Sequence, residues 1–171
     1  MSYSIRRLGS DDVEAYRAIR LEALTNHPTA FFVSAEAFLQ RPLAELVQLL
    51  EQMVFFGAIT PAGELVGILA YERGKNRQTH RGSVYQVYVK PAMRGTGCAR
   101  ALIDTVVAHA QTEVQQLHLS VESQNEPAIR LYQKAGFAIY GTDPRFQSVN
   151  GRFCDEHLMV RFFDKAPGED K

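Results

Sequence analysis

A glycine-rich turn between a strand pattern and a helix pattern constrains this chain more than any other feature. Residues 84–89 form an alternating apolar run that Pro91 ends, and a helical pattern begins near Gly97. Residues 94–99, Arg-Gly-Thr-Gly-Cys-Ala, lie between them. Glycine permits a tight turn and close backbone approach, and the first N–H groups of a helix have no intrahelical partner. The turn therefore predicts an anion site suited to a phosphate or pyrophosphate.

The turn departs from both common nucleotide fingerprints. The chain contains no Lys-Ser or Lys-Thr pair for a P-loop, and Arg100 stands where Gly-x-Gly-x-x-Gly needs its third glycine. Glycines at such a place also serve as plain loop punctuation. A nucleotide-binding or interaction protein that uses the turn for another anion is a further alternative, although these departures count against it.

A second block lies about thirty residues further on. Residues 125–137, Asn-Glu-Pro-Ala-Ile-Arg-Leu-Tyr-Gln-Lys-Ala-Gly-Phe, resemble the Asn-x-x-Ala-x-x-x-Tyr-x-x-x-Gly-Phe block of the GNAT superfamily of N-acetyltransferases. Arg94, Gly97 and Ala99 match the Arg/Gln-x-x-Gly-x-Gly/Ala signature of the same superfamily. The resemblance covers residues 84–137 and implies an acetyl-CoA-dependent N-acetyltransferase, in which a primary amine attacks the thioester directly.

The order of predicted elements fits that fold. Strands are expected at 3–8, 54–60, 65–72, 84–89, 117–122 and from 137 on, with a hairpin at 146–161 turned at Asn150-Gly151; helices are expected after an N-cap at 10–12 and near 34–40, 42–52, 97–112 and 126–135. The order predicts an α/β (α+β) domain. The resemblance implies a mixed, mostly antiparallel seven-stranded sheet flanked by helices, with strands four and five splayed. We expect one domain over residues 1–171, with a disordered tail after residue 164.

Charge and composition narrow the partners. The formal net charge is zero, which argues against duplex nucleic acid or an anionic membrane as the partner. No apolar run is long enough to span a bilayer, and no signal-peptide pattern is present. The two cysteines form neither a disulfide framework nor a metal-ligand cluster. We expect a cytoplasmic protein without a metal, and the resemblance makes a homodimer possible.

The resemblance also implies cofactor contacts. The pantetheine arm of acetyl-CoA is expected on the backbone of Val87, Tyr88 and Val89, and Asn125 is expected both to bond that arm and to cap the following helix. The pyrophosphate is expected on the turn, at Arg94, Gly95, Thr96, Gly97, Cys98, Ala99 and Arg100. For Arg100 the alternative is a solvated helix face. For Cys98, packing as a small apolar residue is favoured over reactivity.

Tyr132 is the predicted general acid. A phenol is protonated at neutral pH and can protonate a departing CoA thiolate; the alternative is an aromatic residue that only packs. The general base is not evident. Ser120 stands where some relatives carry a fifth-strand glutamate, and the fourth strand has none either. His118, Ser120 and Glu122 share one strand face. Glu72, His80 and Glu156 are further candidates, each interpreted as a surface or structural residue, and a water chain is the alternative.

The acceptor is expected to be a small-molecule amine or a peptide amine. Phe31 and Phe32, in an apolar loop between the first helices, either line its pocket or pack in the core. The missing glutamates keep a second function open, a non-catalytic acyl-CoA-binding or sensing module.

Overall fold

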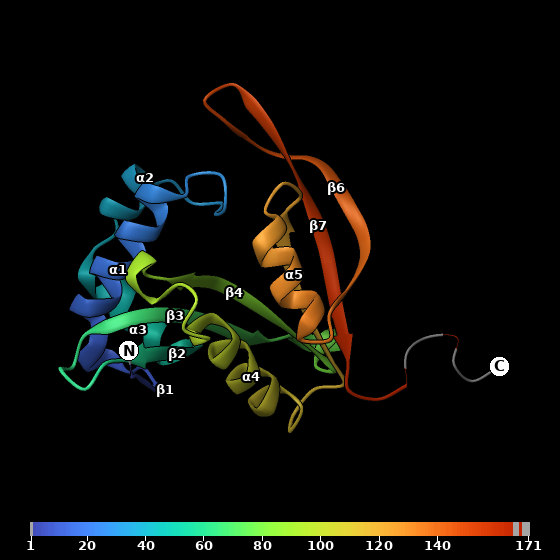
Figure 1. The fold of residues 1–171 in the computed structure, drawn as a ribbon, viewed down its shortest axis with the longest axis horizontal. Helices are drawn as coiled ribbons and strands as arrows, with labels where there is room; N and C mark the ends of the chain where they lie inside the picture. The colour runs from blue at the N-terminus through green and yellow to red at the C-terminus, as the bar shows by residue number, and fades with distance from the viewer. Residues whose placement is uncertain (1, 166–167, 169–171) are drawn as a thin grey trace.

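The computed structural model describes residues 2–165 and 168, and the predicted elements are all present within a few residues of their expected ends (Figure 1). Of the tail predicted to be disordered after residue 164, most lies outside the described residues. The helices and strands, in chain order, are β1 (Ser4–Arg7), α1 (Val13–Asn26), α2 (Ala35–Leu39), α3 (Leu43–Gln52), β2 (Val54–Ile59), β3 (Leu65–Arg73), β4 (Arg81–Val89), α4 (Cys98–Ala110), β5 (Gln116–Glu122), α5 (Glu126–Lys134), β6 (Ala138–Val149) and β7 (Arg152–Phe162).

The strands form one seven-stranded sheet in the order β1-β2-β3-β4-β5-β7-β6. All neighbours are antiparallel except β4 and β5, which are parallel. These two strands pair only from Arg81–Gln116 to Ser83–His118 and then diverge. The prediction of a mixed, mostly antiparallel sheet with strands four and five splayed is confirmed. The splay opens the sheet next to the glycine-rich turn.

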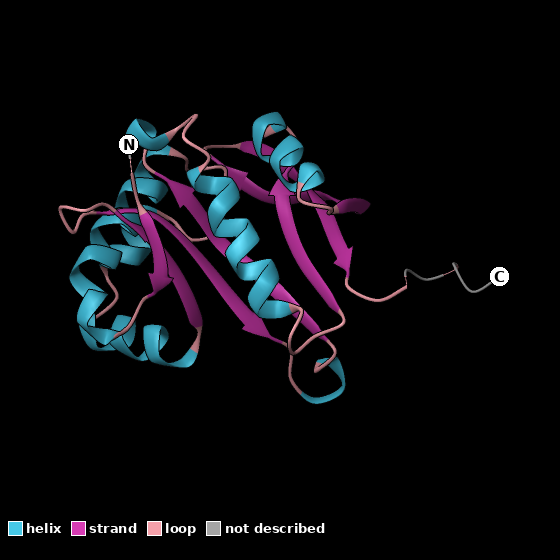
Figure 2. Ribbon diagram, turned by 60° about the horizontal axis from the view of Figure 1, so that its bottom comes forward, coloured by secondary structure: helices cyan, strands magenta, loops and turns pink. Residues whose placement is uncertain are grey.

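Helices cover both faces of the sheet, because neighbouring strand residues point to opposite sides. In β2, Phe56 packs in the core cluster under α4 and α5, whereas Phe55 packs in the cluster under α1, α2 and α3. Figure 2 shows α4 lying across the first of these faces. Strands β2 and β3 are therefore buried on both sides, which gives the splayed β4 a rigid support.

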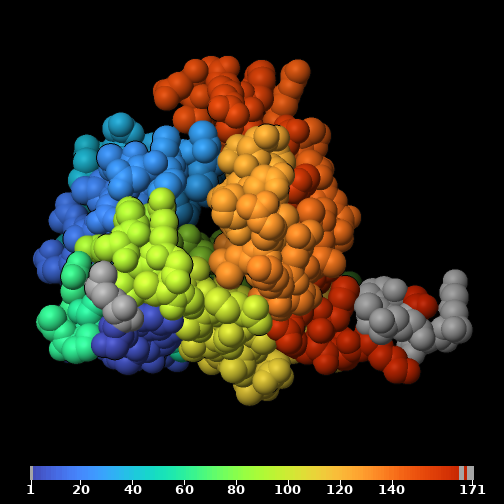
Figure 3. All heavy atoms as spheres, viewed as in Figure 1, coloured from blue at the N-terminus to red at the C-terminus, as the bar shows by residue number. Residues whose placement is uncertain are grey.

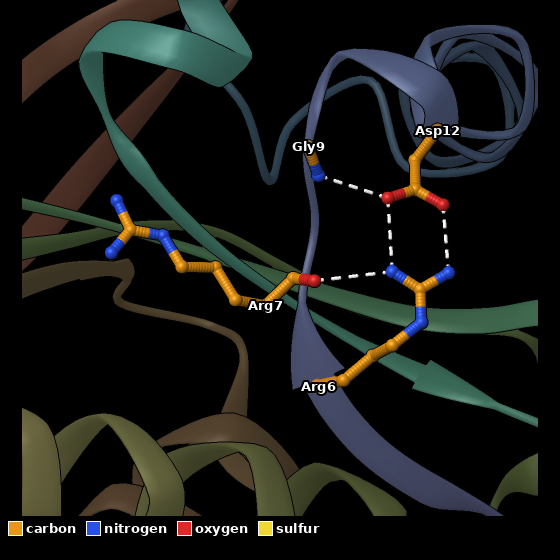
Figure 4. A network of polar contacts seen from close by, with 4 residues as sticks. All are labelled: Arg6, Arg7, Gly9 and Asp12. Carbon is orange, nitrogen blue, oxygen red and sulfur yellow. Dashed lines mark hydrogen bonds and ion pairs between the residues drawn. The ribbon is translucent and has the colours of Figure 1, made fainter.

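The start of α1 differs from the predicted N-cap. Residues Ser10–Asp12 form a short 3-10 turn, and no side chain caps α1. Instead the Asp12 carboxylate accepts from the Gly9 N–H at 2.9 Å and from both Arg6 guanidinium nitrogens at 2.8 and 2.9 Å (Figure 4). Asp12 thus connects β1 to α1, because its carboxylate pairs with Arg6 of β1. The sequence pattern did not indicate this ion pair.

Other local predictions agree with the structure. Asn125 caps α5 through its side-chain oxygen, which accepts from the Ala128 N–H at 3.3 Å. Asn150 and Gly151 turn the β6–β7 hairpin with φ values of 51° and 77°, the left-handed pair that a type I′ turn requires. None of the helices in residues 2–165 is long and apolar enough to cross a bilayer.

Candidate active site

A cavity of about 1130 Å³ opens where β4 and β5 diverge. Figure 3 shows it as a hollow between the N-terminal helices, the turn before α4 and helix α5. Nearly all the residues predicted to contact acetyl-CoA line it: Val87, Tyr88, Val89, Arg94, Gly95, Gly97, Cys98, Ala99, Arg100, Asn125 and Tyr132. Thr96 is the exception. Its side chain folds back within the turn, and its hydroxyl donates to the Met93 carbonyl.

The glycine-rich turn presents open backbone to this cavity. Gly95 and Gly97 adopt left-handed conformations, with φ values of 75° and 82°. A Cβ atom at Gly95 would meet nothing within 4 Å, and one at Gly97 would meet only the Tyr3 hydroxyl at 3.8 Å. The first intrahelical bond of α4 runs from Ala101 N–H to the Gly97 carbonyl, so the N–H groups of residues 98–100 precede it. Unfilled space beside free N–H groups at a helix N-terminus fits an anion such as a pyrophosphate.

Two arginines flank the turn. The Arg94 guanidinium lies 3.2 Å from the His27 ring, and the Arg100 guanidinium pairs with Asp104 at 2.8 Å along α4. Both line the cavity, and Arg100 and Asp104 are about half exposed. The Arg100 side chain thus combines the two predicted positions, on the helix surface and at the cavity mouth. Together the arginines add positive charge beside the helix N-terminus, which favours a negatively charged ligand.

The edge of β4 supplies a second set of backbone groups. Beyond Ser83 no strand of the described chain pairs with β4 on the β5 side, whereas Tyr88 and Val89 still pair with β3 on the other. An unpaired strand edge offers N–H and C=O groups to an extended ligand, which can add to the sheet as another strand does. An amide-containing arm such as pantetheine fits this edge.

Helix α5 carries the two remaining predicted residues. The side-chain oxygen of Asn125 accepts the capping hydrogen bond, so the amide N–H groups of Asn125 can donate to a ligand in the cavity. The Tyr132 ring packs against Phe137, with 6.2 Å between ring centroids, and is 7% exposed. Burial raises the pKa of the Tyr132 phenol well above its ordinary value. The ring is part of the core, as one alternative expected, and the same residue also borders the cavity.

Glu156, one of the further base candidates, is buried in the cavity wall. On β7 it is 9% exposed, which excludes a surface position, and it lines the cavity with Glu72, Ser120 and Glu122. Burial raises the pKa of its carboxyl, the Ser120 hydroxyl lowers it in part, and the Asp143 carboxylate raises it further. Alternation along residues 152–162 would have placed Glu156 on the buried face with Cys154, which was the available signal.

The histidine candidates lie elsewhere. His118 does not border the cavity; its ring contacts the Gln116 amide at 2.7 Å and the edge of the Tyr140 ring. Burial, with the nearby Arg81 and His80 charges, lowers the pKa of His118 to about 4. His80 is likewise outside the lining. Neither imidazole is therefore placed to act on a ligand in this cavity.

Cys98 has the position of a packing residue. Cys98 is the buried first residue of α4, and burial raises the pKa of its thiol, as the packing interpretation expects. Among residues 2–165 and 168, no three His, Cys, Asp or Glu side chains gather as a metal site would need.

The N-terminal segment forms the far wall of the cavity. Phe31 is partly buried in the core cluster of α1, α2 and α3, and Phe32 is 78% exposed against the Phe146 ring of β6. Both phenylalanines line the cavity, and Phe31 also packs against the core, so Phe31 has both of the positions that the sequence left open. The same wall contains Arg20 of α1, a residue that the sequence did not single out.

Comparisons with known proteins agree with this geometry. Residues 16–137 match the model of the acetyltransferase (GNAT) family. The mycothiol acetyltransferase of Propionibacterium freudenreichii subsp. shermanii is 31% identical over 78% of this chain, and the L-amino acid N-acetyltransferase AaaT of Escherichia coli is 28% identical over 58% of this chain and 62% of its own length. The chain spans about two fifths of the length of the mycothiol acetyltransferases it matches.

Solved structures show the same fold. The ribosomal-protein-alanine N-acetyltransferase from Brucella melitensis has a TM-score of 0.82 at 26% identity, covering 94% of this chain and 99% of that one. An acetyltransferase structure from Salmonella typhimurium with its cofactor acetyl-CoA has a TM-score of 0.79 at 23% identity, covering 98% of each chain.

Proposed function

The chain belongs to the acetyltransferase (GNAT) family, and from that premise we propose that it is an acetyl-CoA-dependent N-acetyltransferase acting on a primary amine. One observation carries the proposal. The left-handed glycine turn, the unpaired edge of β4, Tyr132 and Glu156 all border one cavity. An anion site, an amide-binding edge, an acid and a base are the parts that this reaction needs.

Two parts of acetyl-CoA, the pyrophosphate and the pantetheine arm, would bind to different parts of the cavity. The turn and the first N–H groups of α4 would hold the pyrophosphate, with charge-assisted bonds from Arg94 and Arg100. The backbone of Val87, Tyr88 and Val89 and the Asn125 amide would hold the pantetheine arm. The bound thioester supplies the activated acetyl group.

Tyr132 is our candidate for the general acid. Its raised pKa keeps the phenol protonated at neutral pH, and the protonated form can donate to a sulfur leaving group. Burial is the cause of that raised pKa, and no side-chain hydrogen bond within residues 2–165 and 168 contributes to it, which leaves the phenol proton for a ligand.

Glu156 is our candidate for the general base. An amine arrives protonated at neutral pH and must lose a proton before it can act as a nucleophile. A buried carboxylate with a raised pKa accepts that proton more readily than an exposed one. Glu156 lies on the strand next to Ser120, so in this chain a glutamate of β7 takes the role that some relatives give to β5.

The alternative function is a non-catalytic acyl-CoA-binding or sensing module. Release of free CoA from acetyl-CoA, followed across a panel of primary amines, separates the two. Amine-dependent release supports the enzyme. Tight acetyl-CoA binding with no release for any amine would favour the sensing module, and no binding at all would contradict both. A cytoplasmic location and a homodimer stay predictions.

A further inference from the structure

Arg20 is a buried charge in the cavity wall, and no acidic residue of the described chain pairs with it. The side chain is 5% exposed, and its Nη1 atom has no hydrogen-bond partner within residues 2–165 and 168. Its guanidinium lies over the Phe31 ring, 4.5 Å from the centroid. A buried guanidinium nitrogen without a partner is unfavourable, because burial removes its hydration and no hydrogen bond replaces it. Such a charge is retained where a ligand supplies the counter-charge.

The charged groups around Arg20 confirm that the protein does not neutralise it. Glu72, Glu122 and Glu156 share the cavity, and none of them forms an ion pair with Arg20. Arg41, between α2 and α3, is a cation whose charge acts on the nearby Tyr16 phenol, and it pairs with Glu45. The titratable group that acts directly on Arg20 is the Tyr16 phenol, and burial raises the pKa of that phenol, so it is neutral at pH 7.

A second hydrogen-bond donor lies on the same side of the cavity. The Tyr16 hydroxyl donates to the side-chain oxygen of Gln86 at 2.8 Å, which leaves the Gln86 amide N–H groups unused. Gln86 sits in β4 where the pairing with β3 shifts register, and it adopts a left-handed φ of 55°. A non-glycine residue in this conformation is strained and is typical of functional sites. Gln86 lines the cavity, and its bond to Tyr16 fixes the side chain at the cavity wall.

We propose that Arg20, with the Gln86 amide, binds the carboxylate of the amine acceptor. A planar guanidinium and an amide are the donors that a carboxylate accepts from, and a charge-assisted pair in a desolvated wall is a strong contact. Phe31, Phe32 and Phe146 line the same region and would contact an apolar side chain. The acceptor class is therefore an apolar amino acid, with amine and carboxylate on one small molecule. This inference rests on the proposed function.

The test compares apolar L-amino acids with their amides, which keep the amine and side chain but lack the carboxylate. For the native chain we expect kcat/KM to favour the amino acid over its amide by about 30-fold or more, the range of hydrogen bonds to charged groups. In Arg20→Gln the preference falls to within about threefold, while acetyl-CoA affinity is unchanged. Arg17→Gln, one turn earlier on α1 and outside the cavity lining, keeps the native preference.

A binding measurement separates this inference from the proposed function. The melting temperature of the native chain should rise with the amino acids and not with the amides, and the rise should be absent in Arg20→Gln. If no compound releases CoA but this pattern holds, the proposed function fails and the carboxylate site stands. Equal turnover and equal stabilisation by acids and amides would overturn the carboxylate site, as would an unchanged preference in Arg20→Gln.

Two further measurements keep the test decisive if Arg20→Gln is poorly folded. Arg20→Lys keeps the charge but loses the planar fork, and it should retain part of the preference. The acid-against-amide comparison on the native chain needs no variant at all. A preference for the amides there would overturn the proposal by itself.

Discussion

Glu156 of β7 lies directly opposite Glu122 of β5 in the antiparallel ladder, and both residues line the cavity beside the glycine turn. The pair offers a matched comparison, because each residue is a glutamate on a neighbouring strand at the same level of the sheet. Burial raises the pKa of the Glu156 carboxyl, and this is why Glu156 is our candidate for the base.

Replacing Glu156 by Gln should remove the base and keep the shape of its side chain. We expect kcat to fall by about 10²-fold or more, the usual contribution of a general base. In the native chain, kcat/KM should rise with pH through a group whose pKa lies above the ordinary range of glutamate, because only the carboxylate accepts a proton. Steady-state kinetics against pH measures both. Glu122→Gln is the control, and a larger loss in that variant would assign the base to β5 instead.

Replacing Tyr132 by Phe should lower turnover and spare binding. The change removes a buried hydroxyl whose pKa is shifted by burial and not by a hydrogen bond within the described chain, so the free energy of unfolding should not fall. We expect kcat to drop by about 10²-fold, with the acetyl-CoA Kd within about threefold of the native value. Calorimetry and kinetics together check this. Tyr140→Phe, on β6 outside the cavity lining, is the matched control, and full turnover in Tyr132→Phe would remove this residue as the acid.

Replacing Gly97 by Val should disrupt the anion site. Valine at a φ of 82° is strained, and its side chain enters the space left beside the turn. We expect the acetyl-CoA Kd to rise by about 100-fold, since strain and lost contacts together reach a few kcal/mol. Gly63→Val is the control, because Gly63 has a φ of 86° in the β2–β3 turn, away from the cavity. Equal affinity in both variants would contradict the proposed pyrophosphate site.

His118 should make stability depend on pH. Its pKa is lowered to about 4 in the folded chain, below the ordinary 6.5, so the unfolded chain takes up the proton first as the pH falls. The stabilisation is complete above pH 6.5 and is lost between 6.5 and 4, by up to about 3 kcal/mol. Urea unfolding at several pH values measures it, and His118→Gln should show a smaller loss. The raised pKa of Glu156 changes the free energy of unfolding with pH in the opposite direction, and it does so in both proteins. The quantity to compare is therefore the slope of the unfolding free energy against pH in the native chain and in His118→Gln. Identical slopes would contradict the prediction.

Features that depend on local chemistry could be predicted from the sequence. Asn125 caps α5, and Asn150-Gly151 turns the β6–β7 hairpin, because a few neighbouring residues decide each conformation. The splay of β4 from β5 was expected from the family resemblance, since no local pattern in either strand encodes where their pairing stops.

Features that depend on distant contacts could not be predicted in this way. Glu156 reaches the cavity only through the register of β7 on β5, and Arg20 only through the packing of α1 beside β4. Gln86 has a left-handed backbone conformation, which a glutamine in a strand pattern does not predict. Asp12 binds Arg6 instead of capping α1 with its side chain, because a cation from β1 lies within reach. Of these residues, Glu156, Arg20 and Gln86 line the cavity, whereas Asp12 connects β1 to the start of α1.

The central claim is that the cavity transfers an acetyl group from acetyl-CoA to an amine. The most direct measurement incubates the chain with ¹³C-acetyl-CoA and a panel of primary amines, apolar amino acids included, and analyses the products by mass spectrometry. We predict a product that carries the labelled acetyl group on nitrogen, formed in step with free CoA and strongly reduced in Tyr132→Phe. Binding of acetyl-CoA without a labelled product from any amine, or equal product from the Tyr132→Phe variant, would contradict the account.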